Sequence, residues 1–403
     1  MTTPFIMSVR ILCVFICSRS FMKKRILFFE LTFVFILACV AEATNTPDAN
    51  LPRETEPAIS AEGGDMSSQI DSLMESYFES TSPGGAVMVI QNGGIVYQNG
   101  YGLADVENRA PITTDTVFHL GSVGKQFTAM GIMMLVEQGR LNYDDPISNY
   151  LPELKWMGDE VTVRRLLHHT SGILGYDDSD EIYDALVASA DLPTNDDLLN
   201  VLAEVGNFQS DPGEQYSYSN TGYDILGALI ERVSGQTYSA FMSDNIFEPL
   251  KMTHTFAMPN NQRLNGKNVA ASYYFENGKP WAYEPDPLDL LSGSGSIYST
   301  VGDMFLFDQA LYADELVSQE TLVDAFVLGV LNNGEETEYG FALDLGEYAG
   351  ETYAAHSGAW LGFESYYLRF PERNLSVVVL LNFDYLDTGA EGMSFEIADV
   401  YLK

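Results

Sequence analysis

The sequence predicts an α+β fold in which both ends of the globular part supply strands to one antiparallel sheet, with flanking helices and an inserted helical region. Near the start of this part, residues 86–90 and 95–101 flank an Asn-Gly-Gly turn, which is typical of a β-hairpin. The middle of the chain is mostly helical in pattern, with Gly and Pro between the segments. Strand patterns return in the last part of the chain, over residues 339–344, 352–356, 364–370 and 375–382.

Apolar spacing and capping residues predict the helices. Apolar side chains recur at helical spacing between residues 70 and 78, so an amphipathic helix is expected to open the globular part near Ser67. Thr300 and Asp303 are placed to cap a helix over residues 304–311. Further helices are expected over residues 163–168, 221–233 and 393–402.

The chain divides into a leader, a tether and one domain. Residues 1–43 contain a basic stretch (MKKR), a short apolar run and an Ala-Glu-Ala cleavage pattern, which together are typical of a signal segment. Residues 44–65 form a polar, proline-containing tether, and residues 66–403 form the domain. Cys39 offers a second processing site, because ILAC resembles a bacterial lipobox. We expect a periplasmic, envelope or secreted protein, cut before Thr44 or lipid-anchored at Cys39.

Charge and cysteine content exclude several classes of partner. The formal net charge is −37 and the pI is about 4.1, so nucleic acid and anionic membrane surfaces are repelled. A lipid on Cys39 is the one membrane contact that we expect. All three cysteines, Cys13, Cys17 and Cys39, lie in the leader, so the domain should contain no disulfide. No cluster of His, Asp and Glu has metal-ligand spacing, and we expect neither a metal nor a cofactor.

Residues 118–135 carry the first chemical signal. Ser122 and Lys125 stand three residues apart at the head of a long apolar run, so a helix beginning near Ser122 places both side chains on one face. An amine in partly dry surroundings can lose its proton and act as a base beside the hydroxyl. The apolar run indicates a buried helix.

Two further motifs follow in the chain: Y-S-N at residues 218–220, on a turn before a helix, and H-S-G at residues 356–358, at the end of a strand. With S-x-x-K at residues 122–125, these motifs resemble those of the serine β-lactamase-related family. This family includes class C β-lactamases, penicillin-binding DD-peptidases, D-aminopeptidases and related esterases. The resemblance extends along most of residues 66–403 and implies a β-lactamase/transpeptidase-like fold with an acyl-enzyme mechanism.

The resemblance implies a role for each motif residue. Ser122 is the expected nucleophile that carries the acyl group. Lys125 and Tyr218 share the proton transfers, and either of them can be the general base. Asn220 is expected to orient Lys125 or the substrate amide. The backbone N–H groups of Ser122 and Ala359 are the expected oxyanion hole.

The third motif has His356 where typical class C β-lactamases have lysine. We expect His356 and Gly358 to border the substrate beside Ala359. Histidine above its usual pKa of about 6.5 offers a hydrogen bond but little charge. The site should therefore favour carboxylate substrates only weakly, and more strongly as the pH falls towards about 6.

Several nearby residues receive structural interpretations. Tyr216 is the competitor of Tyr218, and we expect it to pack rather than react. His168 and His169 are expected to end a helix, as cations or bound to carbonyl groups, with His169 fixing the following loop. His119 and His254 are expected to be structural or exposed.

These observations predict an exported serine hydrolase that acts through a Ser122 acyl-enzyme on a small peptide, amide or ester. Two alternatives remain open at this point. One is a true class C-like β-lactamase. The other is a non-catalytic penicillin-binding sensor of the envelope on the same fold.

Overall fold

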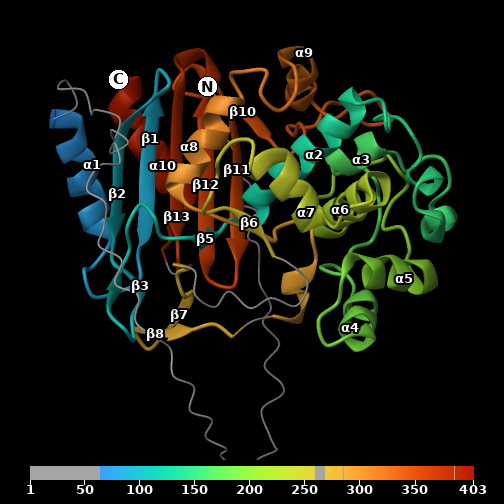
Figure 1. The fold of residues 1–403 in the computed structure, drawn as a ribbon, viewed down its shortest axis with the longest axis horizontal. Helices are drawn as coiled ribbons and strands as arrows, with labels where there is room; N and C mark the ends of the chain where they lie inside the picture. The colour runs from blue at the N-terminus through green and yellow to red at the C-terminus, as the bar shows by residue number, and fades with distance from the viewer. Residues whose placement is uncertain (1–63, 259–267, 285, 385) are drawn as a thin grey trace, which may run out of the picture. The chain divides into compact units, whose positions relative to one another are not determined.

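The computed structural model describes residues 64–258, 268–284, 286–384 and 386–403. Its largest sheet has six antiparallel strands in the order β10-β11-β12-β13-β1-β2 (Figure 1). Its strands are β1 (Gly85–Gln91), β2 (Gly94–Tyr101), β10 (Asp344–Tyr348), β11 (Glu351–Trp360), β12 (Phe363–Phe370) and β13 (Leu375–Leu381). The predicted α+β fold with a sheet built from both ends of the domain is therefore confirmed.

Strand β1 joins the two ends of the domain, because it pairs with β2 on one side and with β13 on the other. The β1–β13 register runs from Gly85 opposite Leu381 to Gln91 opposite Leu375. Side chains alternate between the two faces of a strand. Val87 and Val89 accordingly belong to one apolar cluster, while Met88 belongs to the other. The strand is thus buried on both faces, which explains its continuous apolar sequence.

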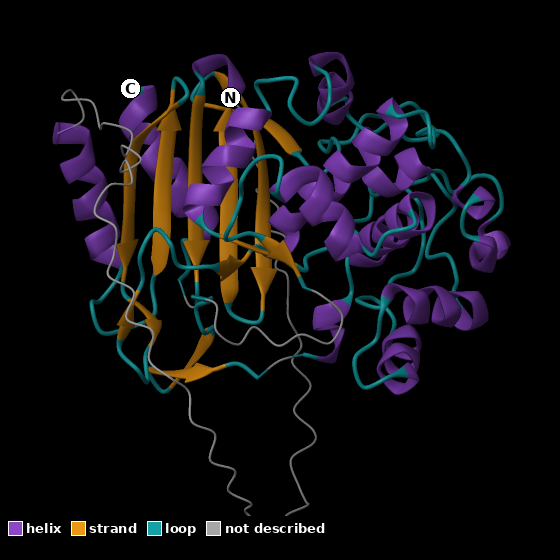
Figure 2. Cartoon of the chain, viewed as in Figure 1, coloured by secondary structure: helices purple, strands orange, loops and turns teal. Residues whose placement is uncertain are grey.

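Helices cover both faces of the sheet (Figure 2). Helices α1 (Gly64–Tyr77) and α10 (Gly389–Leu402) pack with the smaller of the two large clusters on one face. Helix α8 (Val301–Ala310) packs on the other face, against β1 and β13. No helix within the described residues is long and apolar enough to span a membrane.

The inserted region is mainly helical and continues the larger apolar cluster. Its α-helices are α2 (Lys125–Glu137), α3 (Val163–Leu167), α4 (Asp180–Ser189), α5 (Asn195–Val205), α6 (Asn220–Ser234) and α7 (Tyr238–Met242), with α9 (Gln319–Leu322) following α8. Its short helical turns are η2 (Gly121–Gly124), η3 (Ile147–Asn149), η4 (Pro152–Met157), η5 (Ser243–Phe247), η6 (Pro287–Leu290) and η7 (Val323–Phe326), while η8 (Pro371–Arg373) joins β12 to β13. The small strands are β3 (Leu103–Asp105), β4 (Ala110–Pro111), β5 (Phe118–His119), β6 (Phe256–Ala257), β7 (Tyr273–Glu276), β8 (Lys279–Ala282) and β9 (Ile297–Ser299).

One predicted strand is wrong. Residues 339–344 form a tight turn, in which the N–H of Gly340 donates to the carbonyl of Leu343 at 2.8 Å and Ala342 has a φ of 55°. The strand begins only at Asp344. Apolar alternation at Tyr339, Phe341 and Leu343 reflects burial in the core rather than an extended backbone. The predicted leader and most of the tether lie outside the described residues.

A buried ion pair fastens α8 to the sheet. Asp308 of α8 is 1 % exposed, and its carboxylate lies 3.4 Å from the guanidinium of Arg369 in β12. The same oxygen accepts hydrogen bonds from the hydroxyls of Tyr367 at 2.7 Å and Ser376 at 2.6 Å. One carboxylate therefore joins the helix to two strands.

Replacing Asp308 with alanine should lower the free energy of unfolding by about 3–5 kcal/mol, because it leaves Arg369 charged and buried without its partner. Urea unfolding followed by circular dichroism measures the change. The exposed Asp191→Ala variant is the control and should change the stability by less than about 0.5 kcal/mol. Equal effects of the two substitutions would contradict this interpretation of the ion pair.

Candidate active site

Ser122 lies in the tight turn η2, which leads directly into α2. In a 3-10 turn, side chains three residues apart lie one above the other. The amine of Lys125 accordingly lies 2.9 Å from the hydroxyl oxygen of Ser122. The expected serine–lysine pair is present, but the serine precedes the α-helix instead of occupying its first turn.

The Lys125 amine is enclosed by polar acceptors. Lys125 has 0 % exposed surface, and its amine donates to the side-chain oxygen of Asn220 at 2.7 Å and to the carbonyl of Ser294 at 2.9 Å. Burial lowers its pKa to about 7, against the opposing charges of Asp224 and Asp177. A substantial fraction of the amine is therefore neutral near pH 7.

Tyr218 is the tyrosine that reaches the serine–lysine pair. Its ring centroid lies 4.9 Å from the Lys125 amine, and its hydroxyl is hydrogen-bonded to Ser122. Tyr218 is partly exposed, and burial of its hydroxyl raises its pKa well above the usual value. Tyr216 instead packs against His169 and Tyr339.

Strand β11 approaches the nucleophile turn through two glycines. A Cβ on Gly358 would lie 2.1 Å from the carbonyl oxygen of Leu120 and 3.0 Å from the backbone nitrogen of Ser122. A Cβ on Gly121 would lie 2.5 Å from the backbone nitrogen of Ala359. Only glycine fits at both positions, and the backbone of Ala359 is thereby held against the turn that carries Ser122.

His356 lies away from the pocket. It is 1 % exposed, and its Nε2 is 2.7 Å from the hydroxyl of Tyr339. Burial lowers the pKa of His356 to about 3. The expected gain of charge towards pH 6 is therefore wrong, because the imidazole stays neutral in the core.

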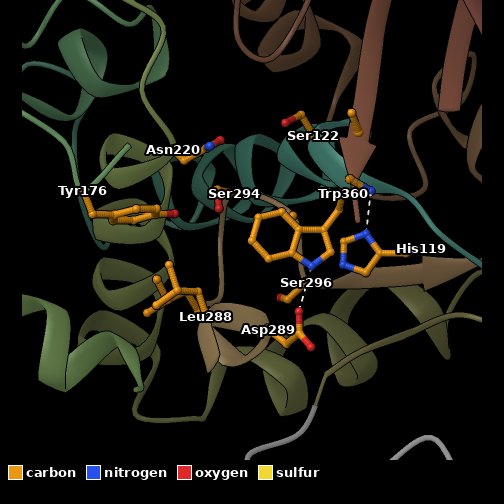
Figure 3. Close-up of a pocket in the computed structure, with 13 residues that line it drawn as sticks. His119, Ser122, Tyr176, Asn220, Leu288, Asp289, Ser294, Ser296 and Trp360 are labelled. Atoms are coloured by element: carbon orange, nitrogen blue, oxygen red, sulfur yellow. Dashed lines mark hydrogen bonds between the residues drawn. The ribbon is translucent and has the colours of Figure 1, made fainter. Parts of the chain in front are cut away.

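A pocket opens beside Ser122 and Asn220, and Figure 3 shows Trp360, His119 and Asp289 on its other side. The Trp360 indole N–H donates to the Asp289 carboxylate at 2.7 Å. The pocket is lined by His119, Gly121, Ser122, Tyr176, Asn220, Leu288, Asp289, Leu291, Ser294, Gly295, Ser296, Ala359 and Trp360.

The histidines near the site form structural contacts. His119 accepts the N–H of Gly121 at 2.9 Å through Nδ1, and burial lowers its pKa to about 3. His168 bonds to the carbonyl of Tyr339, and burial lowers its pKa to about 4, so the carbonyl-bound interpretation holds and the cationic one does not. His169 accepts the N–H of Ser219 at 3.1 Å, which ties it to the turn that carries Tyr218.

Three residues that support the Lys125 amine were not predicted from the sequence: Ser294, Asp224 and Tyr176. Asp224 is 0 % exposed and accepts the N–H of Ser294 at 2.8 Å and the hydroxyl of Tyr176 at 2.8 Å. One signal was present: Asp224 follows Asn220 by four residues, so both lie on the same face of α6. Ser294 acts through its backbone, which leaves no signal in the sequence.

Comparison with known proteins shows the family to which this chain belongs. The family described as Beta-lactamase matches residues 67–402, so the chain belongs to the β-lactamase family. A penicillin-binding protein of Bacillus subtilis is 33 % identical over 327 residues, which cover 78 % of this chain and 71 % of the relative. Protein flp of Staphylococcus aureus is 27 % identical over 347 residues, covering 83 % of this chain and 67 % of the relative.

Solved structures agree with this membership. An octameric penicillin-binding protein homologue from Pyrococcus abyssi matches with a TM-score of 0.70 and 29 % identity, covering 84 % of this chain and 77 % of the other. A penicillin-binding protein from Bacillus halodurans matches with a TM-score of 0.70 and 25 % identity, covering 82 % and 99 %. The β-lactamase/transpeptidase-like fold is confirmed, and the relatives support a serine hydrolase or penicillin-binding type of function.

The close approach of β11 to the nucleophile turn can be tested with Gly358→Ala. The added methyl group must push the strand away from Leu120 by about 1 Å, and a displacement of that size at a reacting centre costs about a hundredfold in rate. The measurement is kcat on a neutral p-nitrophenyl ester. Gly94→Ala, on strand β2, is the control: its added Cβ would lie 3.8 Å from the nearest atom, the carbonyl oxygen of Gln91, so kcat should not change. An unchanged kcat in Gly358→Ala would contradict the steric argument.

Proposed function

We propose that this chain is a serine hydrolase that forms an acyl-enzyme on Ser122 and hydrolyses a small peptide, amide or ester. The observation that carries the proposal is the environment of the Lys125 amine. Its two hydrogen-bond partners other than Ser122 are the carbonyl oxygens of Asn220 and Ser294, which can only accept hydrogen bonds. A neutral amine has two N–H groups and one lone pair, so its lone pair is left facing the Ser122 hydroxyl.

Lys125 is then the general base for acylation. As the Ser122 oxygen bonds to the acyl carbon, its proton passes to the amine of Lys125 at 2.9 Å. A pKa of about 7 suits this task, because the amine is available as a base and still holds the proton once it has received it. Tyr218 supports the same route as a neutral phenol, since its raised pKa disfavours a phenolate in the resting protein.

The later steps use the same groups. The proton on Lys125 passes, directly or through the Tyr218 hydroxyl, to the leaving group as its bond to the acyl carbon breaks. Water then attacks the ester of Ser122 and gives a proton to Lys125, and Lys125 passes this proton to the Ser122 oxygen as the bond to the acyl carbon breaks and the acid departs. The N–H groups of Ser122 and Ala359 stabilise the oxyanion in both steps, a role that the close packing of Gly121 and Gly358 supports.

The charge of the pocket favours a neutral acyl group over a carboxylate. Among the described residues that line it, Asp289 is the one acidic side chain, and neither Lys nor Arg takes part. His119 is neutral because burial lowers its pKa to about 3. A substrate carboxylate would approach Asp289 without a cation at the pocket surface, which is unfavourable. This supports peptide, amide or ester hydrolysis over a true β-lactamase.

Loss of the nucleophile gives the primary test of this function. Ser122→Ala should lower hydrolysis of a p-nitrophenyl ester by at least about a thousandfold, because the covalent route is removed. Wild-type protein should also turn over the ester repeatedly, and any fluorescent penicillin bound to it should depend on Ser122.

The alternatives give different results in the same assay. Stable penicillin labelling with no turnover of ester or penicillin would indicate a binding sensor, and fast penicillin hydrolysis would indicate a β-lactamase. A variant lacking the serine but retaining more than about a tenth of the wild-type turnover would refute the acyl-enzyme.

We also propose export to the cell envelope, on the strength of the basic and apolar pattern in residues 1–43. The mature protein should begin at Thr44 or carry a lipid on Cys39. Intact-mass measurement of protein isolated from native cells distinguishes the two forms. A mass that still contains residues 22–38 contradicts both.

A further inference from the structure

The two acceptors of Lys125 are each held by a carboxylate outside the catalytic group. Asp224 of α6 accepts a hydrogen bond from the backbone N–H of Ser294. The carbonyl oxygen of Ser294 in turn accepts a hydrogen bond from the Lys125 amine. Its second oxygen accepts the hydroxyl of Tyr176 at 2.8 Å. Hydrogen bonds to both oxygens are what an ionised carboxylate accepts, and Asp224 has 0 % exposed surface.

Asp177 has the corresponding place beside Asn220. Its carboxylate accepts a hydrogen bond from the Asn220 side chain, whose oxygen faces Lys125. The Asn220 amide therefore lies between a carboxylate and an amine, with its N–H₂ group towards Asp177. Asp177 lies at the surface end of this chain of contacts.

We propose that Asp224 and Asp177 are positioning residues for the general base, holding Ser294 and Asn220 against Lys125 and supplying the negative field in which Lys125 exchanges its proton. The inference rests on the acyl-transfer function proposed above and extends it. Neither residue needs to touch the substrate. Both act through Lys125.

The electrostatic part follows from the groups around the amine. Burial alone favours neutral Lys125, and the charges of Asp224 and Asp177 oppose it, so that the pKa is about 7. Burial and the charge of Asp224 raise the pKa of Asp177 to about 6, so Asp177 is mainly ionised where Lys125 titrates. The other titratable groups described around the amine and the two carboxylates are His169, His356, Tyr176, Tyr218, Tyr223, Tyr238 and Asp178.

The two histidines and the four tyrosines of this set are neutral near pH 7. Burial lowers the pKa of His356 to about 3 and that of His169 well below its usual value, and it raises the pKa of the tyrosines. Asp178 acts on Asp177 from the exposed side. Asp224 and Asp177 are therefore the charges that keep the pKa of Lys125 from falling further than burial has already lowered it.

Hydrolysis requires neutral Lys125, so kcat/KM rises with pH through the Lys125 pKa and the acid limb of the wild-type profile should lie near pH 7. Removing a negative charge lowers this pKa, and the limb moves to lower pH. Asp224→Asn should move it down by about one unit, because an opposite charge at close range shifts a pKa by about 1–3 units.

The experiment measures pH profiles of kcat and kcat/KM on a neutral p-nitrophenyl ester for wild type, Asp224→Asn and Asp177→Asn. The limb should shift in the same direction in Asp177→Asn but by less, since the more exposed charge is better screened. The plateau of kcat should fall in both variants, by about tenfold in Asp224→Asn, because a more acidic amine is a weaker base. KM should stay within about twofold, since neither carboxylate is proposed to bind substrate.

Asp303→Asn is the matched control. Asp303 is also buried and accepts a backbone N–H, from His254, and a hydroxyl, from Thr255, both at 2.8 Å. These partners lie outside the pocket lining, so its acid limb should coincide with that of wild type. If the acid limb of the pH profile shifted equally in Asp303→Asn, the shift would follow from the loss of any buried carboxylate, and the proposal would be overturned.

The outcomes separate this inference from the proposed function. Ser122-dependent turnover with an unshifted limb in folded Asp224→Asn and Asp177→Asn overturns the positioning role alone. Turnover that survives Ser122→Ala overturns the proposed function itself. If Asp224→Asn does not fold, the more exposed Asp177→Asn variant decides, and an unshifted limb there overturns the proposal.

Discussion

The site depends on a lysine amine that is removed from water. Burying Lys125 disfavours its ammonium form, and this cost is acceptable only because the amine finds acceptors in Asn220 and Ser294 and a hydroxyl in Ser122. These partners come from α6, from the segment before β9 and from the turn η2. Three distant parts of the chain must therefore meet at one nitrogen atom. The buried helix α2 provides the fixed support from which Lys125 reaches them.

The sheet forms the other side of the pocket beside Ser122. Strand β11 is held by β10 and β12 and passes so close to η2 that Gly121 and Gly358 have no room for a side chain. The spacing is set by backbone contact, and it is therefore insensitive to side-chain rotation. Asp308 and Arg369 fasten helix α8 to the same sheet. The pocket thus lies between strand β11, which supplies Ala359 and Trp360, and the helical region, which supplies Asn220.

Much of the fold and of the site could be predicted from the sequence, and the parts that could not be predicted depend on burial or on contacts between distant segments. The hairpin of β1 and β2, the late strands and the serine–lysine pair follow from local periodicity and spacing, which a single segment contains. The turn at residues 339–344 was misread because burial of Tyr339 and Phe341 imitates strand alternation. Asp224 was missed because its partner Ser294 lies 70 residues away and uses only its backbone. The charge expected on His356 failed because burial, unlike residue type, is a property of the folded chain.

The place of β1 in the sheet also constrains the order in which the protein folds. Its neighbour β13 lies almost the whole domain away; the backbone N–H of Gly84 bonds to the side chain of Asn382, a separation of 298 residues. The chain can form the hairpin and the helices early, but the sheet stays open along β1 until the last strand, β13, has paired with it. Contacts this distant in sequence slow folding. Until then the unpaired edge of β1 is available to other strands, and an open edge makes an incompletely folded chain prone to aggregation.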